Sequence, residues 1–193
     1  MYNSKKNRVL DNKIDIAGCI WNYCIAAHRT YYKLYKKTLP LYDLQKHITK
    51  LKKKSKYSYW KQLDAQAVQD VVERVERSYK AFFDHVKKNK FGKKSPPKFK
   101  KITKYSSFTL KHNNYSFHDN NIITIMKNDY KYFRNQEIQG KIKTVTIKRD
   151  KLGDFYIFVV AEQEMREVNS RVGNAIGIDF GMKHFLKMFY YLH

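Results

Sequence analysis

A single carboxylate at the end of a short apolar strand is the feature of this sequence best suited to metal chemistry. Asp179 ends the run Ile176-Gly177-Ile178-Asp179, and Gly181 follows it closely. In a strand, Ile176 and Ile178 would share one face, and the glycines would let a backbone or a phosphate approach closely. An Asp in this position can hold Mg²⁺, which needs few protein carboxylates but rarely just one. The same pattern also fits an ordinary buried strand that ends in a turn.

The charge balance indicates the kind of partner. Forty Lys and Arg against seventeen Asp and Glu give a formal net charge of +23 on 193 residues. Such self-repulsion is tolerated best beside a polyanion, and the sixteen Tyr, twelve Phe and two Trp suit base stacking. No acidic residue occurs between Asp84 and Asp119. The alternative is a solvated Lys-rich surface that reflects the codon bias of an AT-rich genome.

The remaining composition restricts the class of protein. The chain is 42% hydrophobic, which is enough for a real core. Its two cysteines, Cys19 and Cys24, are five residues apart and make neither a CxxC pair nor a zinc ribbon, so no zinc is expected. We expect no signal peptide and no membrane-spanning helix. The expected location is therefore the cytoplasm, or the nucleoid when the protein is bound to DNA.

Hydrophobic periodicity predicts a helical region over residues 13–90. Apolar residues recur at steps of three and four from Ala17 onward, and Pro40 is expected to end the first helix. The clearest helix is predicted over residues 64–88, with Asp64 as its N-cap. Pairs four residues apart, such as Asp70 and Arg74, are expected on its polar face.

A basic linker is predicted over residues 91–104. The stretch from Lys87 to Lys104 holds nine lysines and no acid, and its paired prolines favour an extended chain. We expect it to contact the phosphate backbone of a nucleic acid, although a solvated hinge would have the same composition. The candidate nucleic-acid-binding residues in it are Lys87, Lys88, Lys90, Lys93, Lys94, Lys98, Phe99, Lys100, Lys101 and Lys104.

Short alternating strands are predicted over residues 105–170. Phe108 and Leu110 alternate, Asp119-Asn120-Asn121 is expected to form a turn, and residues 149–154 are expected to form a hairpin loop. This spacing suggests a small antiparallel β-barrel. The predicted fold class is therefore α+β, with an N-terminal helical bundle followed by a β-barrel.

Five segments together carry a resemblance to a known family. They are Leu63 to Val75 (LDAQAVQDVVERV), Ser95 to Lys100 (SPPKFK), Ser107-Phe108, Gly153 to Tyr156 (GDFY) and Gly177 to Lys183 (GIDFGMK). With these segments in this order the chain resembles TnpB, the transposon-encoded RNA-guided nuclease of OrfB type, which is related to type V CRISPR effectors. The resemblance covers roughly residues 13–185.

The resemblance implies a function and a division into domains. It implies a helical recognition domain at 13–90, a wedge domain at 105–170 and the first strand of a RuvC-type, RNase H-like nuclease domain at 173–193. Asp179 matches the first catalytic Asp, a Mg²⁺ ligand, and Lys183 matches a lysine of the same motif. The expected partners are guide RNA and DNA, with no membrane.

The chain also departs from the family. His184 stands where Asn is usual, and the residues after Phe185 do not match. The catalytic Glu, the second Asp and the zinc-ribbon cysteines of the family would lie further on. The nuclease strand at 175–185 is thus expected to lack its sheet neighbours. We therefore expect a truncated TnpB-like protein that binds nucleic acid without cutting it. The alternatives are a degenerate remnant without activity, or the N-terminal half of a nuclease completed in trans.

Overall fold

A computed structural model describes residues 5–88, 95–111, 114–134, 137–163, 176–179 and 187–190. For residues 5, 6, 176–179 and 187–190 it describes the backbone only. The chain divides into one compact unit up to Gln163 and a second, smaller unit after it.

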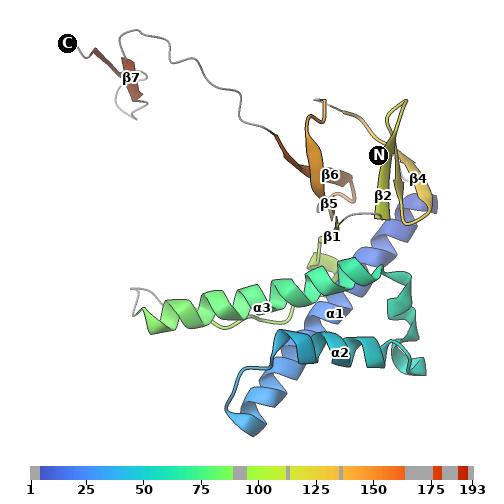
Figure 1. The fold of residues 1–193 in the computed structure, drawn as a ribbon, viewed down its shortest axis with the longest axis vertical. Coiled ribbons are helices and arrows are strands. Elements are labelled where there is room, and N and C mark those ends of the chain that lie inside the picture. Colours follow the sequence, from blue (N-terminus) through green and yellow to red (C-terminus); the bar gives the residue numbers. More distant parts are fainter. Residues whose placement is uncertain are drawn as a thin grey trace. The chain divides into compact units, whose positions relative to one another are not determined.

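Three α-helices form the first half of the larger unit (Figure 1). They are α1 (Lys5–Tyr35), α2 (Leu41–Leu51) and α3 (Ala65–Lys87), joined by the 3-10 helix η1 (Ser55–Gln62). The first helix begins at Lys5, not at 13 as predicted, because Leu10 and Ile14 extend its buried stripe toward the N-terminus. It ends at Tyr35, before Pro40, because Lys36 adopts a positive φ of 55° and closes the last turn.

Helix α3 confirms the clearest prediction and corrects one detail. Asp64 is its N-cap, and the Asp64 carboxylate accepts a 2.7 Å hydrogen bond from the backbone N–H of Gln66. The ion pair between Asp70 and Arg74 is present at 2.6 Å. It was expected on the polar face, yet the Asp70 side chain is only 6% exposed. The reason is that α3 contacts α1 with one side and strand β1 (Ser107–Lys111) with another.

Two three-stranded antiparallel sheets make up the rest of this unit. One has the order β1-β5-β6 and the other the order β2-β3-β4. Their further strands are β2 (Tyr115–His118), β3 (Ile122–Ile125), β4 (Asn128–Lys131), β5 (Lys141–Arg149) and β6 (Phe155–Glu162). The α+β prediction is confirmed, but the described strands form two separate sheets and do not close into a barrel.

Both predicted turns are present. The turn between β2 and β3 places Asn120 and Asn121 at φ of 59° and 56°, a conformation that Asn tolerates better than most residues. In the loop between β5 and β6, the Asp150 carboxylate accepts hydrogen bonds from the backbone N–H groups of Leu152 and Asp154. Gly153 has a φ of 91° in this loop.

The helices and both sheets share one hydrophobic core. Ile14 and Ile20 of α1 belong to the same buried cluster as Phe108 of β1, Ile147 of β5 and Ile123 of β3. No helix among the described residues has the length and apolar character needed to cross a membrane.

The smaller unit contains the strand that ends in Asp179. Strand β7 (Ile176–Asp179) pairs antiparallel with β8 (Lys187–Tyr190), and Asp179 lies opposite Lys187. The prediction that this strand lacks a neighbour is therefore wrong. The segment Met188-Phe189-Tyr190 supplies the partner, because aromatic residues favour strands.

Candidate nucleic-acid interface

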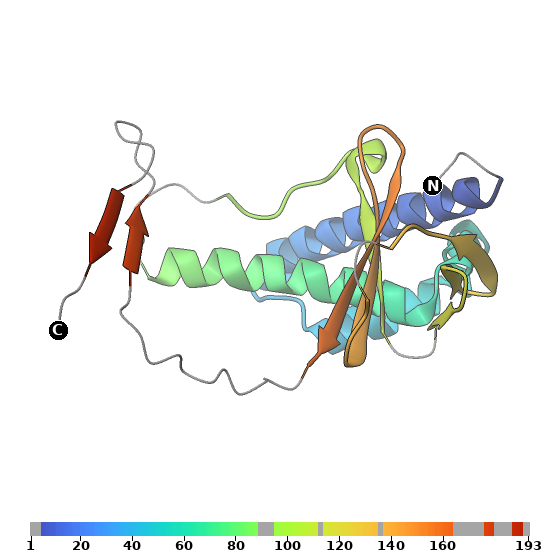
Figure 2. The same cartoon turned by 90° about the horizontal axis from the view of Figure 1, so that it is seen from above.

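The described part of the basic linker, residues 95–104, is held against helix α1 (Figure 2). We call it the basic strip. The Trp21 indole N–H donates a 3.2 Å hydrogen bond to the carbonyl of Lys98. Asn22 makes two bonds of 2.8 Å to the backbone of Lys100, donating to its carbonyl and accepting from its N–H. Arg29 donates to the carbonyl of Pro97 at 3.3 Å.

The order of these contacts gives the direction of the strip. Asn22 and Arg29 are seven residues apart, which is two helical turns and about 10 Å along α1. The earlier residue, Asn22, contacts Lys100, and the later one, Arg29, contacts Pro97. The strip therefore runs antiparallel to α1 (Figure 2), and this spacing is compatible with an extended chain between Pro97 and Lys100.

The strip continues into a tight junction with the core. Beyond the short 3-10 helix η2 (Ile102–Lys104), Tyr105 is buried against α1 at Gly18. A Cβ at Gly18 would lie 3.0 Å from Cβ of Tyr105, so this position accommodates only glycine without displacement. Arg149 of β5 donates to the Tyr105 carbonyl at 3.2 Å. Both ends of the strip are thus fixed to the folded core.

The lysines of the strip fall into two groups. Lys98, Lys101 and Lys104 are exposed and available to a partner. Lys100, although exposed as a residue, has its ammonium 4.2 Å from the ring centre of Trp21 and 5.4 Å from that of Tyr105. Burial lowers the pKa of Lys100, and the nearby charge of Arg74 lowers it further. Lys100 therefore anchors the strip through cation–π contacts, which makes it a weaker candidate for a phosphate contact than its neighbours.

The other candidate residues are placed as follows. Phe99 is 51% exposed, and the guanidinium of Arg29 lies 4.6 Å from its ring centre. Lys87 and Lys88 are exposed at the C-terminal end of α3. Lys90, Lys93, Lys94 and Lys183 lie outside the described residues, as does the side chain of Asp179. Within the ranges that the structure describes, no cluster of three or more His, Cys, Asp or Glu is arranged to hold a metal ion.

Several acidic residues pair with basic residues of other elements. Arg149 pairs with Asp11 at 2.7 Å and with Asp15 at 2.9 Å, which ties β5 to α1. The carboxylate of Glu73 pairs with Lys111 of β1 at 2.9 Å.

Arg74 completes this internal network. It holds Asp70 and also donates to the Ser107 carbonyl and hydroxyl, each at 3.1 Å, and to the Thr109 hydroxyl. The pairs of Arg149 and Lys111 thus join helices to strands.

The sequence did not single out the side chains that hold the strip. Trp21 and Asn22 lie about 77 residues from the carbonyls they contact, and no local pattern signals such a pairing.

A second basic surface was also missed, although six lysines within residues 50–61 were a visible signal. Its exposed lysines are Lys50, Lys53, Lys54, Lys56 and Lys61, and Tyr59 among them is 40% exposed.

No family model matches the chain, and no curated protein matches it.

Proposed function

We propose that this chain is a TnpB-like protein that binds guide RNA and DNA through the basic strip and its surroundings. The observation that carries the proposal is the arrangement of the strip, an extended segment clamped on α1 that presents Lys98, Lys101 and Lys104 outward. A segment held in place before binding loses little conformational entropy when a partner arrives.

The spacing of these lysines suits a phosphate backbone. Lys98 and Lys101 are three residues apart, which corresponds to about 10 Å in an extended chain. Each strand of B-DNA carries one phosphate charge per 3.4 Å of helix axis. Lys98 and Lys101 would therefore each meet a different phosphate, and Lys104 follows them in the 3-10 helix η2. Contacts of this kind position a nucleic acid and carry no sequence information.

The finer assignment follows the resemblance to TnpB. On this proposal the helices α1 to α3 form the recognition domain, the two sheets form the wedge domain, and Asp179 marks the first nuclease strand. A two-metal nuclease centre needs carboxylates that converge from several strands. Of the catalytic carboxylates that the resemblance implies, these 193 residues match only Asp179. We therefore propose that the chain on its own binds nucleic acid and does not cleave it.

Binding and cleavage are tested together. A structured RNA from a transposon end and a DNA duplex are each titrated with the purified chain, with Mg²⁺ present, and the products are resolved on a denaturing gel. We expect salt-dependent binding to intact nucleic acid and no cleavage. Mg²⁺-dependent cutting that disappears in Asp179→Ala would refute the non-cleaving assignment, and an absence of binding at low salt would refute the proposed function.

A further inference from the structure

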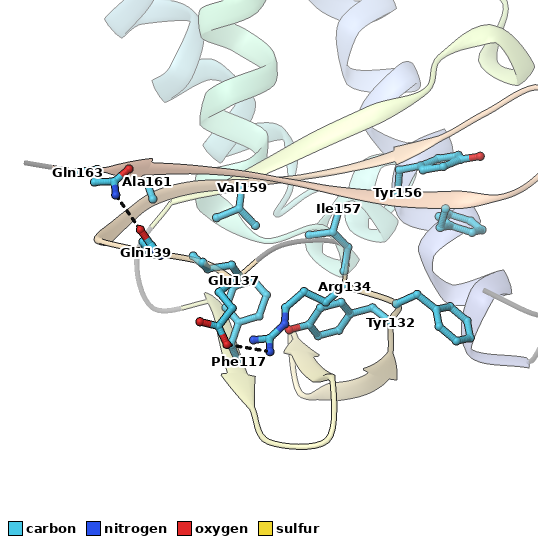
Figure 3. Close-up of a pocket in the computed structure, with 13 residues that line it drawn as sticks. Phe117, Tyr132, Arg134, Glu137, Gln139, Tyr156, Ile157, Val159, Ala161 and Gln163 are labelled. Atoms are coloured by element: carbon cyan, nitrogen blue, oxygen red, sulfur yellow. Dashed lines mark hydrogen bonds and ion pairs between the residues drawn. The ribbon is translucent and has the colours of Figure 1, made fainter. Parts of the chain in front are cut away.

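An open groove lies between the edge strand β6 and the sheet β2-β3-β4 (Figure 3). Its volume is about 1020 Å³. Ile157 and Val159 point from β6 toward Phe117 and Tyr132 on the other side. Strand β6 forms one wall, and Phe117 of β2 forms the other together with described residues of the segment that follows β4. The groove therefore lies where the two sheets are not joined by hydrogen bonds.

Aromatic side chains gather in this groove from separate elements. They are Phe117 of β2, Tyr132 and Phe133 after β4, and the buried Phe155 of β6. Phe133 is 79% exposed, and Phe117 and Tyr132 are half-buried. The ring of Tyr156 lies on the other face of β6 from Ile157 and Val159 (Figure 3). Aromatic rings that remain accessible in one cleft indicate a binding site.

Polar groups accompany the rings. Arg134 follows Phe133 directly and pairs with Glu137 at 3.7 Å. Gln139 and Gln163 join their side-chain amides at 2.8 Å across one end of the groove. An amide offers both a donor and an acceptor, as the edge of a nucleobase does, and a guanidinium plane can stack on a base.

We propose that this groove binds unpaired nucleobases of a single-stranded nucleic acid. The proposal rests on the proposed function, because the phosphates of the same strand are to be held by basic residues elsewhere on the protein. It adds a second site with a different chemistry, in which ring faces, not charges, hold the ligand. Bases paired in a duplex keep their faces stacked on one another, so the groove selects bases that have left the stack.

The observations favour a nucleic acid over a protein strand. The free edge of β6 offers backbone groups to an added strand. The net charge of +23, however, attracts a polyanion and opposes association with a second copy of the chain. The combination of aromatic rings, amides and a guanidinium also matches the chemistry of a base, which a purely apolar strand would not use.

The test compares two strands that differ only in their bases. A short fluorescent single-stranded DNA and an abasic strand of the same length carry the same phosphates. The wild-type chain is expected to bind the strand with bases on the order of 5- to 100-fold more tightly. Phe133→Ala and Tyr132→Ala should each reduce this preference and leave binding to the abasic strand unchanged. Phe133→Trp should retain it.

Leu152→Ala is the matched control. Leu152 is 88% exposed on the β5–β6 loop, so its truncation removes an exposed apolar side chain outside the groove. The Leu152→Ala variant should prefer the strand with bases as strongly as the wild type does.

Each contrary result has a defined meaning. If the wild type binds both strands equally well, or if Phe133→Ala and Tyr132→Ala keep the full preference, the groove does not hold bases and the proposal fails, while the proposed function stands. If the groove variants instead abolish self-association of the chain in sedimentation experiments and leave base preference unchanged, a protein strand occupies the groove and the proposal also fails. If the wild type binds neither strand at low salt, the proposed function fails as well.

Discussion

Replacing Asn22 with Ala should release the basic strip from helix α1 without unfolding the protein. Asn22 makes two hydrogen bonds of 2.8 Å to the backbone of Lys100. At about 1 kcal/mol of net stabilisation for each bond, their loss costs about 2 kcal/mol, or a factor of about 30 at 25 °C. This free energy stabilises docking of the strip and not the whole fold, because Trp21 and Tyr105 stay buried in the core when the strip is released.

Hydrogen exchange at the Lys100 amide measures this docking directly, because that N–H donates to Asn22. Protection there should fall about 30-fold in Asn22→Ala, while the thermal melting midpoint changes little. Asn12→Ala is the control, since Asn12 also lies on α1 but donates to Gln62 at 2.7 Å, away from the strip. Unchanged protection at Lys100 in Asn22→Ala, or an equal loss in Asn12→Ala, would refute the clamp.

Two further predictions concern stability. Arg149→Ala should lower the free energy of unfolding in urea by about 2 kcal/mol, because Arg149 is 14% exposed and joins Asp11, Asp15 and the Tyr105 carbonyl. Arg134→Ala should change the free energy of unfolding by less than about 0.5 kcal/mol, because Arg134 is 42% exposed. Equal losses of stability in the two variants would contradict the reasoning. Burial lowers the pKa of His28 to about 4, so the unfolded chain takes up the proton first as the pH falls below about 6.5. The contribution of neutral His28 to the free energy of unfolding is thus fully present above pH 6.5, and at most about 3 kcal/mol of it is lost as the pH falls toward 4. His28→Phe should lack this pH dependence, and a dependence equal to that of the wild type would disprove the assignment.

Local patterns predicted the local structure. The apolar spacing of α3 and its cap at Asp64 were readable because both depend on residues within a few turns. The turn at Asn120 and Asn121 was readable because those residue types tolerate a positive φ. These features needed no knowledge of the rest of the chain.

Features that depend on distant segments were not predicted. Asp70 and Arg74 are buried because β1 packs on α3, and Ser107 lies 33 residues from Arg74. The two sheets take the place of the predicted barrel because β1 pairs with β5, with Phe108 opposite Ile147. Periodicity identifies a strand but does not name its partner. The same limit hid the clamp on the strip, in which Asn22 binds a residue 78 positions away.

The salt dependence of nucleic-acid binding tests the central claim most directly. Lys98, Lys101 and Lys104 are changed together to Gln, and the logarithm of the binding constant for duplex DNA is measured against the logarithm of the salt concentration. The control changes Lys37, Lys131 and Lys151, which are equally exposed on other parts of the chain, so both variants lose three charges. We expect the strip variant to flatten the slope by about 2 to 3, at about 0.9 for each lost phosphate contact, and the control to change it by less than about 1. Equal changes in the two variants would show that total charge, and not the clamped strip, is responsible for binding.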